Sequence, residues 1–199
     1  MLLLLAALSG IAHAREPAWR TVSTRDGLLL ETRSVAGERF DELRVSTTLV
    51  ASPDAVADYL FGKYLDAENR NIRRTFIKRD PAVTVWSDIL DTPVISERCY
   101  SMRFEREALA AGGVRVAFTS LAYAGKEPMP GCIALRARGE WRMTPTATGT
   151  RLAYTSLTDL GGRVPALLAR RSLSAAAVSS VSKVVAGVSG LPLPRGIGD

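Results

Sequence analysis

Alternating apolar and polar positions dominate the second half of the chain. Four stretches show this pattern with a period of two residues: 99–104, 114–119, 133–143 and 152–156. In the third stretch, charged side chains such as Arg136 take every second position. Such runs are typical of antiparallel strands with one face in water and the other against a core. The pattern therefore predicts a sheet whose apolar face is covered by another element.

The first half of the chain also predicts strands. Turn signals, the clearest of them Asp26-Gly27, divide residues 22–50 into three strand-like runs. A further pair of strands is expected at 72–78 and 83–89, on either side of an Asp-Pro turn. Because no repeat, linker or low-complexity segment interrupts the chain, we expect one domain.

Two segments carry helical signals. Ser52 before Pro53 is a helix start, because serine caps the first turn and proline fits its first position. This predicts a helix at 53–65. A longer helix is expected at 163–188, where apolar residues recur at helical spacing and Gly190 marks the end.

The long C-terminal helix carries many small side chains. They are Ala175, Ala176, Ala177, Ser179, Ser180 and Ser182. An unfilled void costs about 24 cal/mol per Å³, so a large space under the helix persists only if a ligand fills it. We therefore predict a cavity between sheet and helix; the alternative is an ordinary packed core.

The N-terminus predicts export. Residues 1–14 form an apolar run that ends in Ala12-His13-Ala14, a small-x-small cleavage pattern. No Lys or Arg precedes the apolar run, so a buried strand or a short anchor is the alternative. We expect a signal peptide at 1–14, a domain at 15–199, and a periplasmic or secreted protein.

Charge and composition narrow the chemistry. The chain carries a net charge of +6, and its one histidine is His13, inside the predicted signal peptide. Cleavage would leave no histidine, which excludes Ser-His-Asp or Cys-His catalysis and any His-ligated metal site. Two cysteines alone cannot form a structural zinc site. We expect no catalytic residues, no metal and no cofactor.

Cys99 and Cys132 are a candidate disulfide in an oxidising compartment. The alternative is two buried thiols, because a third strand is expected between theirs. That layout would hold the two Cα atoms beyond the ~7 Å limit for a bridge. The pattern leaves both interpretations open.

The order of three strands, a helix, six strands and a long helix resembles the helix-grip fold of StAR-related lipid-transfer (START) domains, in the Bet v1-like superfamily. Local marks support the resemblance: Arg98 at a strand start, Ser120 at a strand end, Gly139-Glu140-Trp141 before Thr144-Pro145, and Asp159-Leu160-Gly161-Gly162-Arg163-Val164-Pro165. Family members often have Arg-Asp where this chain has Arg98-Cys99, so a local polar pairing is absent. With its Ala- and Arg-rich composition, the chain is identified as a bacterial exported member.

The resemblance implies an α+β fold, a curved antiparallel sheet closed by the long C-terminal helix. It also implies non-catalytic binding and transfer of a lipid or other apolar small molecule. The inward positions of the predicted strands and helix supply the expected lipid-binding residues. They are Tyr100, Met102, Phe104, Val116, Phe118, Ser120, Trp141, Tyr154, Leu168, Val178, Val181 and Val185. Arg98 is expected either at the cavity mouth or in a structural contact.

Two loops are candidates for a lid over the cavity mouth, 107–113 and 122–132, and both are equally explained as ordinary connections. The resemblance favours the first. Five cations within 70–79 predict a transient contact with an anionic membrane surface, since each contributes about 1 kcal/mol near such a surface; the alternative is a solvated face with no partner. We expect a monomer that binds no nucleic acid. Two other functions stay open: a polyketide cyclase or dehydratase of the same superfamily, and a ligand-free interaction domain.

Overall fold

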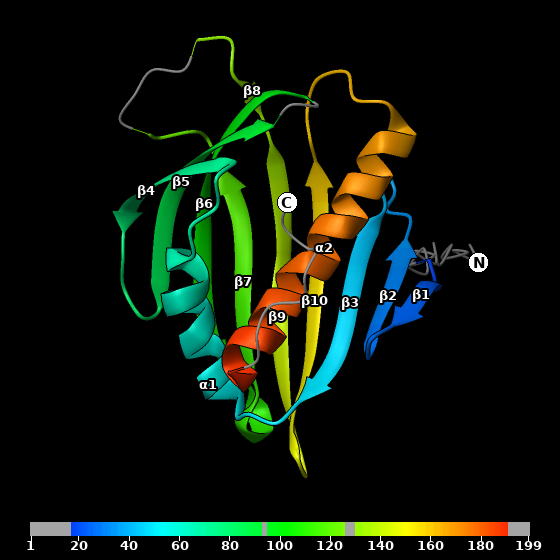
Figure 1. Ribbon diagram of the computed structural model, residues 1–199, viewed down its shortest axis with the longest axis vertical. Helices are drawn as coiled ribbons and strands as arrows, with labels where there is room; N and C mark the ends of the chain where they lie inside the picture. The colour runs from blue at the N-terminus through cyan, green and yellow to red at the C-terminus, as the bar shows by residue number, and fades with distance from the viewer. Residues whose placement is uncertain (1–16, 93–94, 126–129, 191–199) are drawn as a thin grey trace, which may run out of the picture.

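One antiparallel sheet makes up most of the computed structural model, and two helices pack on one of its faces (Figure 1). The structure describes residues 17–92, 95–125 and 130–190. The predicted signal peptide at 1–14 lies outside them. The strands are β1 (Arg20–Arg25), β2 (Leu28–Arg33), β3 (Glu42–Leu49), β4 (Ile72–Lys78), β5 (Val83–Thr92), β6 (Ile95–Ala108), β7 (Val114–Leu121), β8 (Ile133–Ala134), β9 (Arg136–Thr146) and β10 (Gly149–Asp159). The helices are α1 (Pro53–Tyr59), the π-helical η1 (Leu60–Tyr64), the 3₁₀ turn η2 (Ala110–Gly112) and α2 (Ala166–Ser189).

The strands follow the order β1-β2-β3-β10-β9-β7-β6-β5-β4, with every neighbouring pair antiparallel. The short β8 lies off this path and pairs in parallel with β6. The predicted α+β helix-grip architecture, a curved antiparallel sheet closed by a long C-terminal helix, is confirmed (Figure 1). The prediction of six strands between the two helices lacked only β8.

The apolar positions of the alternating strands meet on the face that carries α2, here called the inner face. Phe104 on β6 pairs with Phe118 on β7, and Val116 on β7 pairs with Trp141 on β9. All four side chains are buried in one core cluster. Burial of a large apolar side chain stabilises a fold by about 1.5–3 kcal/mol, so these rows hold the sheet against its helices.

The first helix is less regular than its sequence predicts. The predicted cap is confirmed, since the Ser52 hydroxyl accepts a hydrogen bond of 3.2 Å from the Ala55 amide. Instead of one α-helix over 53–65, α1 passes into the π-helical η1, where Gly62 has non-helical backbone angles. A π-helical turn is wider than an α-turn, so it shifts the side chains that follow it. Tyr64 is brought over the inner face in this way.

The C-terminal helix α2 crosses the inner face diagonally (Figure 1). Pro165 precedes its first turn, and Gly190 ends it with a left-handed φ of 67° that favours glycine. By length and composition α2 is a candidate for crossing a bilayer. The core helix of a globular domain passes the same test, and here Val181 and Val184 are fully buried in the domain's own core.

Cys99 and Cys132 form a disulfide, with their Cα atoms 6.0 Å apart. The expectation of an intervening strand was wrong. The chain turns at Gly131, whose φ is 84°, and lays β8 directly beside β6, with Cys99 opposite Ala134. The segment before β8 therefore lies on the outer face of β6, where the Ala124 amide donates to the buried Ser101 hydroxyl at 2.8 Å.

The outer face of the sheet carries the charged rows that the alternation predicted. A shallow trough of about 630 Å³ runs over its middle strands, with small residues such as Ala117 on its floor. Arginine–carboxylate pairs line it, among them Arg33 with Glu42 and Arg115 with Glu140, both at 2.5 Å. The lining itself holds five arginines and three glutamates. Each of these arginines has a carboxylate within ion-pair distance, in the trough or beside it.

Candidate functional site

A cavity of about 60 Å³ lies between α2 and the strands β3 and β10. Its lining combines small residues of α2 with hydroxyls and one carboxylate. The lining residues are Asp41, Leu43, Tyr154, Ser156, Thr158, Leu173, Ala176, Ala177 and Ser180. This volume is near that of two water molecules, so the predicted lipid-sized space under α2 stays a prediction. Core side chains fill the remainder of the interface.

Tyr154 links this cavity to the aromatic core. Its ring lies 4.3 Å from that of Trp141 and 5.7 Å from that of Phe118, centroid to centroid. The phenol hydroxyl shares a hydrogen bond with Ser156, the neighbouring inward position of β10. Burial raises the pKa of Tyr154 well above its ordinary value, so this hydroxyl stays neutral and serves as a donor or acceptor.

Tyr64 approaches the same region from the opposite side. Its ring packs edge-on against Trp141 at 5.8 Å, and its hydroxyl hydrogen-bonds with Ser180 of α2. Burial raises the pKa of Tyr64, and the Ser180 hydroxyl partly opposes that shift. The two tyrosines therefore present neutral hydroxyls beneath α2, one from η1 and one from β10.

A buried ion pair between Asp88 and Arg74 lies next to these polar groups, on the side of β4. Asp88 on β5 is fully buried and accepts two hydrogen bonds from Arg74, at 2.8 and 2.7 Å. The Trp86 indole and the Tyr100 hydroxyl also donate to it, at 2.9 and 3.0 Å. Four donors thus hold one carboxylate, and burial together with this negative charge raises the pKa of Tyr100. The residues Asp88, Tyr100, Tyr64, Ser180, Tyr154 and Ser156 are called the polar seam below.

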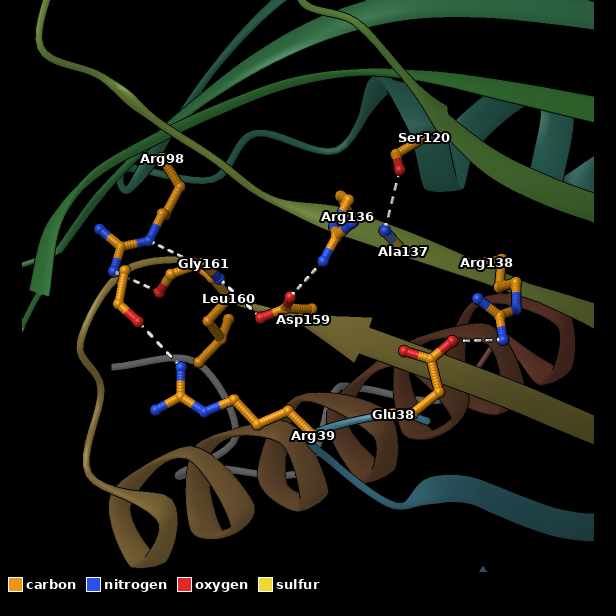
Figure 2. A network of polar contacts seen from close by, with 11 residues as sticks. Glu38, Arg39, Arg98, Ser120, Arg136, Ala137, Arg138, Asp159, Leu160 and Gly161 are labelled. Atoms are coloured by element: carbon orange, nitrogen blue, oxygen red, sulfur yellow. Dashed lines mark hydrogen bonds and ion pairs between the residues drawn. The ribbon is translucent and has the colours of Figure 1, made fainter. Parts of the chain in front are cut away.

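Tight contacts anchor the start of α2 to the sheet (Figure 2). Arg98, only 2% exposed, donates to the Leu160 carbonyl oxygen at 2.5 Å. Arg39 donates to the carbonyl oxygens of Gly162 and Val164, at 2.8 and 2.7 Å. Of the two roles expected for Arg98, the structural one holds, because its guanidinium is occupied by backbone carbonyls.

Asp159 and Gly161 shape the turn that these arginines hold. The Asp159 carboxylate accepts from the Gly161 amide at 2.9 Å and from Arg136 at 2.8 Å (Figure 2). Gly161 has a φ of 64°, and a Cβ there would lie 2.4 Å from the Ala134 carbonyl oxygen. Only glycine fits this close approach. The Asp-Leu-Gly-Gly motif is therefore the joint between the last strand and α2.

The twelve predicted lipid-binding residues occupy different depths. Six are buried in the core cluster: Met102, Phe104, Val116, Phe118, Trp141 and Val181. Four are half-buried against it: Tyr100, Tyr154, Val178 and Val185. Leu168 is half-buried, and the Ser120 hydroxyl accepts from the Ala137 amide at 2.9 Å (Figure 2). Of the twelve, only Tyr154 lines the described cavity.

Most of the polar seam does not follow from the sequence pattern. No inward carboxylate was expected, yet Asp88 shares the inward register of Trp86 on β5. Arg74 was expected in a surface cluster, whereas it is the partner of the buried Asp88. Ser180 was expected only as a small side chain, because the position of Tyr64 depends on the π-helical turn.

The two predicted lid loops lie at opposite ends of the molecule. Residues 107–113 form the turn η2 beyond the C-terminal end of α2, far from the Asp-Leu-Gly-Gly joint (Figure 1). The described part of 122–132 lies on the outer face. Met129, part of that loop, lies outside the described residues.

No protein-family model matches the sequence, and no curated protein matches it either. Several solved structures match the fold. A STAR-related lipid transfer protein from Xanthomonas axonopodis superposes with a TM-score of 0.74 at 20% identity, over 86% of this chain and 98% of that one. The lipid transfer and protein localization domain of human StarD13 gives 0.68 at 17% identity, over 85% and 89%.

An enzyme also shares the architecture. The Zhui aromatase/cyclase from a Streptomyces species superposes with a TM-score of 0.51 at 19% identity, over 75% of this chain and 93% of that one. At such identities the likeness concerns the fold alone. The chain has the helix-grip fold of the StAR-related lipid-transfer domains.

Proposed function

We propose that the protein binds and transfers a lipid or similar apolar small molecule, without catalysis, between the inner face and α2. The observation that carries this proposal is the polar seam. Besides the buried Asp88 carboxylate, it holds a row of hydroxyls on buried and half-buried residues beneath a helix of small side chains, beside the small cavity. The likeness to lipid-transfer proteins of the same fold supports it.

Binding requires the cavity to grow. Ligand pockets commonly measure about 300–1,000 Å³, several times the volume now present. We propose that α2 moves away from β3 and β10, because Ala176 and Ala177, which line the cavity, bury little area there. The hydrogen bond from Arg98 to Leu160 holds the segment before the helix in place. The displacement of α2 from the sheet is therefore expected to increase toward its later turns.

The polar seam then orients the ligand. Neutral hydroxyls of Tyr64, Tyr154 and Ser180 offer donors and acceptors to a ligand hydroxyl, carbonyl or ester. The apolar part of the ligand packs against Trp141 and Phe118, in place of the side chains that contact them now. A buried CH₂ group contributes about 0.8 kcal/mol, so an acyl chain or ring system supplies the affinity.

The same groups favour binding over catalysis. A general base must reach its substrate with a free lone pair. Asp88 is the fully buried carboxylate of the inner face, and four hydrogen bonds from three side chains hold it. A cyclase, the alternative, would chemically change a bound polyketide, so recovery of the ligand unaltered separates the two functions.

We further propose that the protein is exported, acts as a monomer and meets membranes only transiently. The disulfide between Cys99 and Cys132 supports export, because structural disulfides persist in oxidising compartments.

A cavity-filling variant tests the proposal. Ala177→Leu adds three carbons where Ala177 lines the cavity, and Ala176→Leu adds them at the neighbouring lining position. Ala175→Leu is the matched control, since Ala175 is exposed on the same helix and does not line the cavity. Uptake of a fluorescent fatty acid is measured from solution, and thermal unfolding is followed in parallel.

The proposal expects both lining variants to lose uptake while the control retains it. Overpacking costs about 1–3 kcal/mol, so a drop in stability alone is not the readout. Unchanged uptake in both lining variants, with the fold intact, would reject the site beneath α2.

A further inference from the structure

The start of α2 carries an exposed leucine. Leu167 is 64% exposed, whereas other apolar residues of the helix, such as Val181 and Val184, are buried. Single exposed apolar residues are common on protein surfaces, so Leu167 alone indicates nothing. Its neighbours decide the matter. Pro165 and Ala166 beside it are also exposed, and this gives the helix start an apolar tip.

Three exposed arginines lie near that tip in the sequence. Arg170 and Arg171 follow Leu167 by three and four positions, which places all three side chains on one side of the helix. Arg163 is exposed directly after the Asp-Leu-Gly-Gly motif, shortly before the helix begins. Among the described residues, none of these three arginines has an ion-pair partner, whereas arginines elsewhere do, as Arg138 does with Glu38 at 2.7 Å.

The cluster at 70–79, which the sequence suggested for membrane contact, is largely neutralised. Arg74 is bound to the buried Asp88. Arg73 pairs with Glu97 at 3.1 Å, and Arg79 pairs with Asp66 at 2.6 Å. An anionic surface would have to compete with these carboxylates for the guanidinium groups. At the start of α2 there is no such competition, because the described residues offer its arginines no carboxylate partner.

We infer that Arg163, Leu167, Arg170 and Arg171 form a docking surface for an anionic lipid bilayer. This inference rests on the proposed function and names the membrane-facing part of the same site. The cations attract the headgroups, and Leu167 enters the interface between headgroups and acyl chains. We choose an anionic bilayer as the partner because of charge complementarity. Its surface has anionic headgroups outside and apolar acyl chains beneath, which suit the exposed arginines and the apolar tip beside them.

The position of this surface suits delivery of a ligand. Leu173, about one turn after Arg170, and Ala176, nearly two turns after it, line the cavity. The hydrogen bonds from Arg98 and Arg39 fix the joint that carries Arg163. A bilayer bound there therefore lies next to the cavity, against a helix start that does not move away.

Sedimentation with vesicles tests the inference. The purified protein is mixed with vesicles of pure phosphatidylcholine, or of phosphatidylcholine with one-third phosphatidylglycerol, at about 0.1 M salt, where charges are screened beyond about 10 Å. The test variant combines Arg163→Gln, Arg170→Gln and Arg171→Gln. The control combines Arg70→Gln, Arg73→Gln and Lys78→Gln, which removes the same charge from the other cluster.

We expect the wild type and the control to sediment with the anionic vesicles and not with the neutral ones. The test variant should bind about 100-fold more weakly, at about fivefold per cation. Leu167→Ser should weaken binding about tenfold. Equal binding of test variant and wild type, a larger loss in the control, or no preference for anionic vesicles would overturn the inference.

Uptake from solution separates this inference from the proposed function. The docking variants should take up the fluorescent fatty acid like the wild type, because they leave the cavity lining intact. If Ala177→Leu abolishes uptake but the arginine variant still binds vesicles, the docking surface is wrong and the cavity stands. If uptake fails in the wild type, the proposed function fails independently of the vesicle result.

Discussion

Arg98 donates a hydrogen bond to the carbonyl oxygen of Leu160, which lies 62 positions further along the chain. This contact joins the start of β6 to the joint before α2, and a second one at 2.5 Å reaches the Ser96 carbonyl oxygen. A buried guanidinium thus holds the segment that leads into the helix that closes the fold. The contact makes Arg98 a structural residue, and its loss should be felt in stability.

Arg98→Met should destabilise the fold by about 3 kcal/mol. The substitution keeps side-chain volume but leaves buried carbonyl oxygens without donors, and each such loss costs about 1–3 kcal/mol. Urea unfolding measures the difference. Arg138→Met is the matched control, because Arg138 is 59% exposed and its ion pair contributes below about 1 kcal/mol. Equal effects of the two substitutions would contradict the assigned role.

Asp88→Asn should cost about 3–5 kcal/mol, since it leaves the Arg74 guanidinium without its buried counter-charge. Asp91→Asn, at an exposed position of the same strand, should change the free energy of unfolding by less than about 0.5 kcal/mol. Chemical denaturation of both variants checks this. A mild effect of Asp88→Asn would mean that the ion pair does not organise the inner face.

Alkaline pH should destabilise the protein through its tyrosines. Burial raises the pKa of Tyr64, Tyr100 and Tyr154 above the ordinary value of 10.0. Groups with a raised pKa in the folded state stabilise it fully below the unfolded pKa, and this contribution is lost as pH rises through the folded pKa. The free energy of unfolding should therefore decline above about pH 10.

Absorbance of phenolate measures this directly. Of the chain's five tyrosines, those three should ionise only at the pH where circular dichroism reports unfolding. Tyr154→Phe should reduce the alkaline loss of stability. Titration of all tyrosines near pH 10 in a protein that stays folded would contradict the buried seam.

Loss of the disulfide should lower stability by about 3–4 kcal/mol. The bridge closes a loop across a sequence separation of 33 residues, and its removal frees that loop in the unfolded chain. Cys99→Ala with Cys132→Ala tests this by thermal unfolding. The wild type in reductant should reach the same stability as the double variant. A wild type insensitive to reductant would indicate that the bridge does not form.

Strand alternation predicted much of this fold, because side chains on a strand alternate between two faces and burial selects apolar residues for one of them. The strands around Phe104, Phe118 and Trp141 followed from it directly. The disulfide did not follow, since β8 is only two residues long and pairs in parallel after a turn at Gly131. So short a strand leaves no periodicity in a sequence.

The polar seam shows a second limit of pattern reasoning. Asp88 occupies an inward position where alternation predicts an apolar residue, and only its partner Arg74 explains it. Arg74 belongs to a run of cations that resembles a solvated face. Which cation of such a run turns inward depends on the register between β4 and β5, and that register is a property of the folded sheet.

The binding claim is tested most directly by native mass spectrometry of the protein purified from its own host without detergent. The account predicts a complex with one apolar molecule per chain, which dissociates unaltered, and whose mass is absent from the Ala177→Leu variant but present in Ala175→Leu. A wild type that shows only the bare chain, and takes up no lipid when lipid is added, would contradict it.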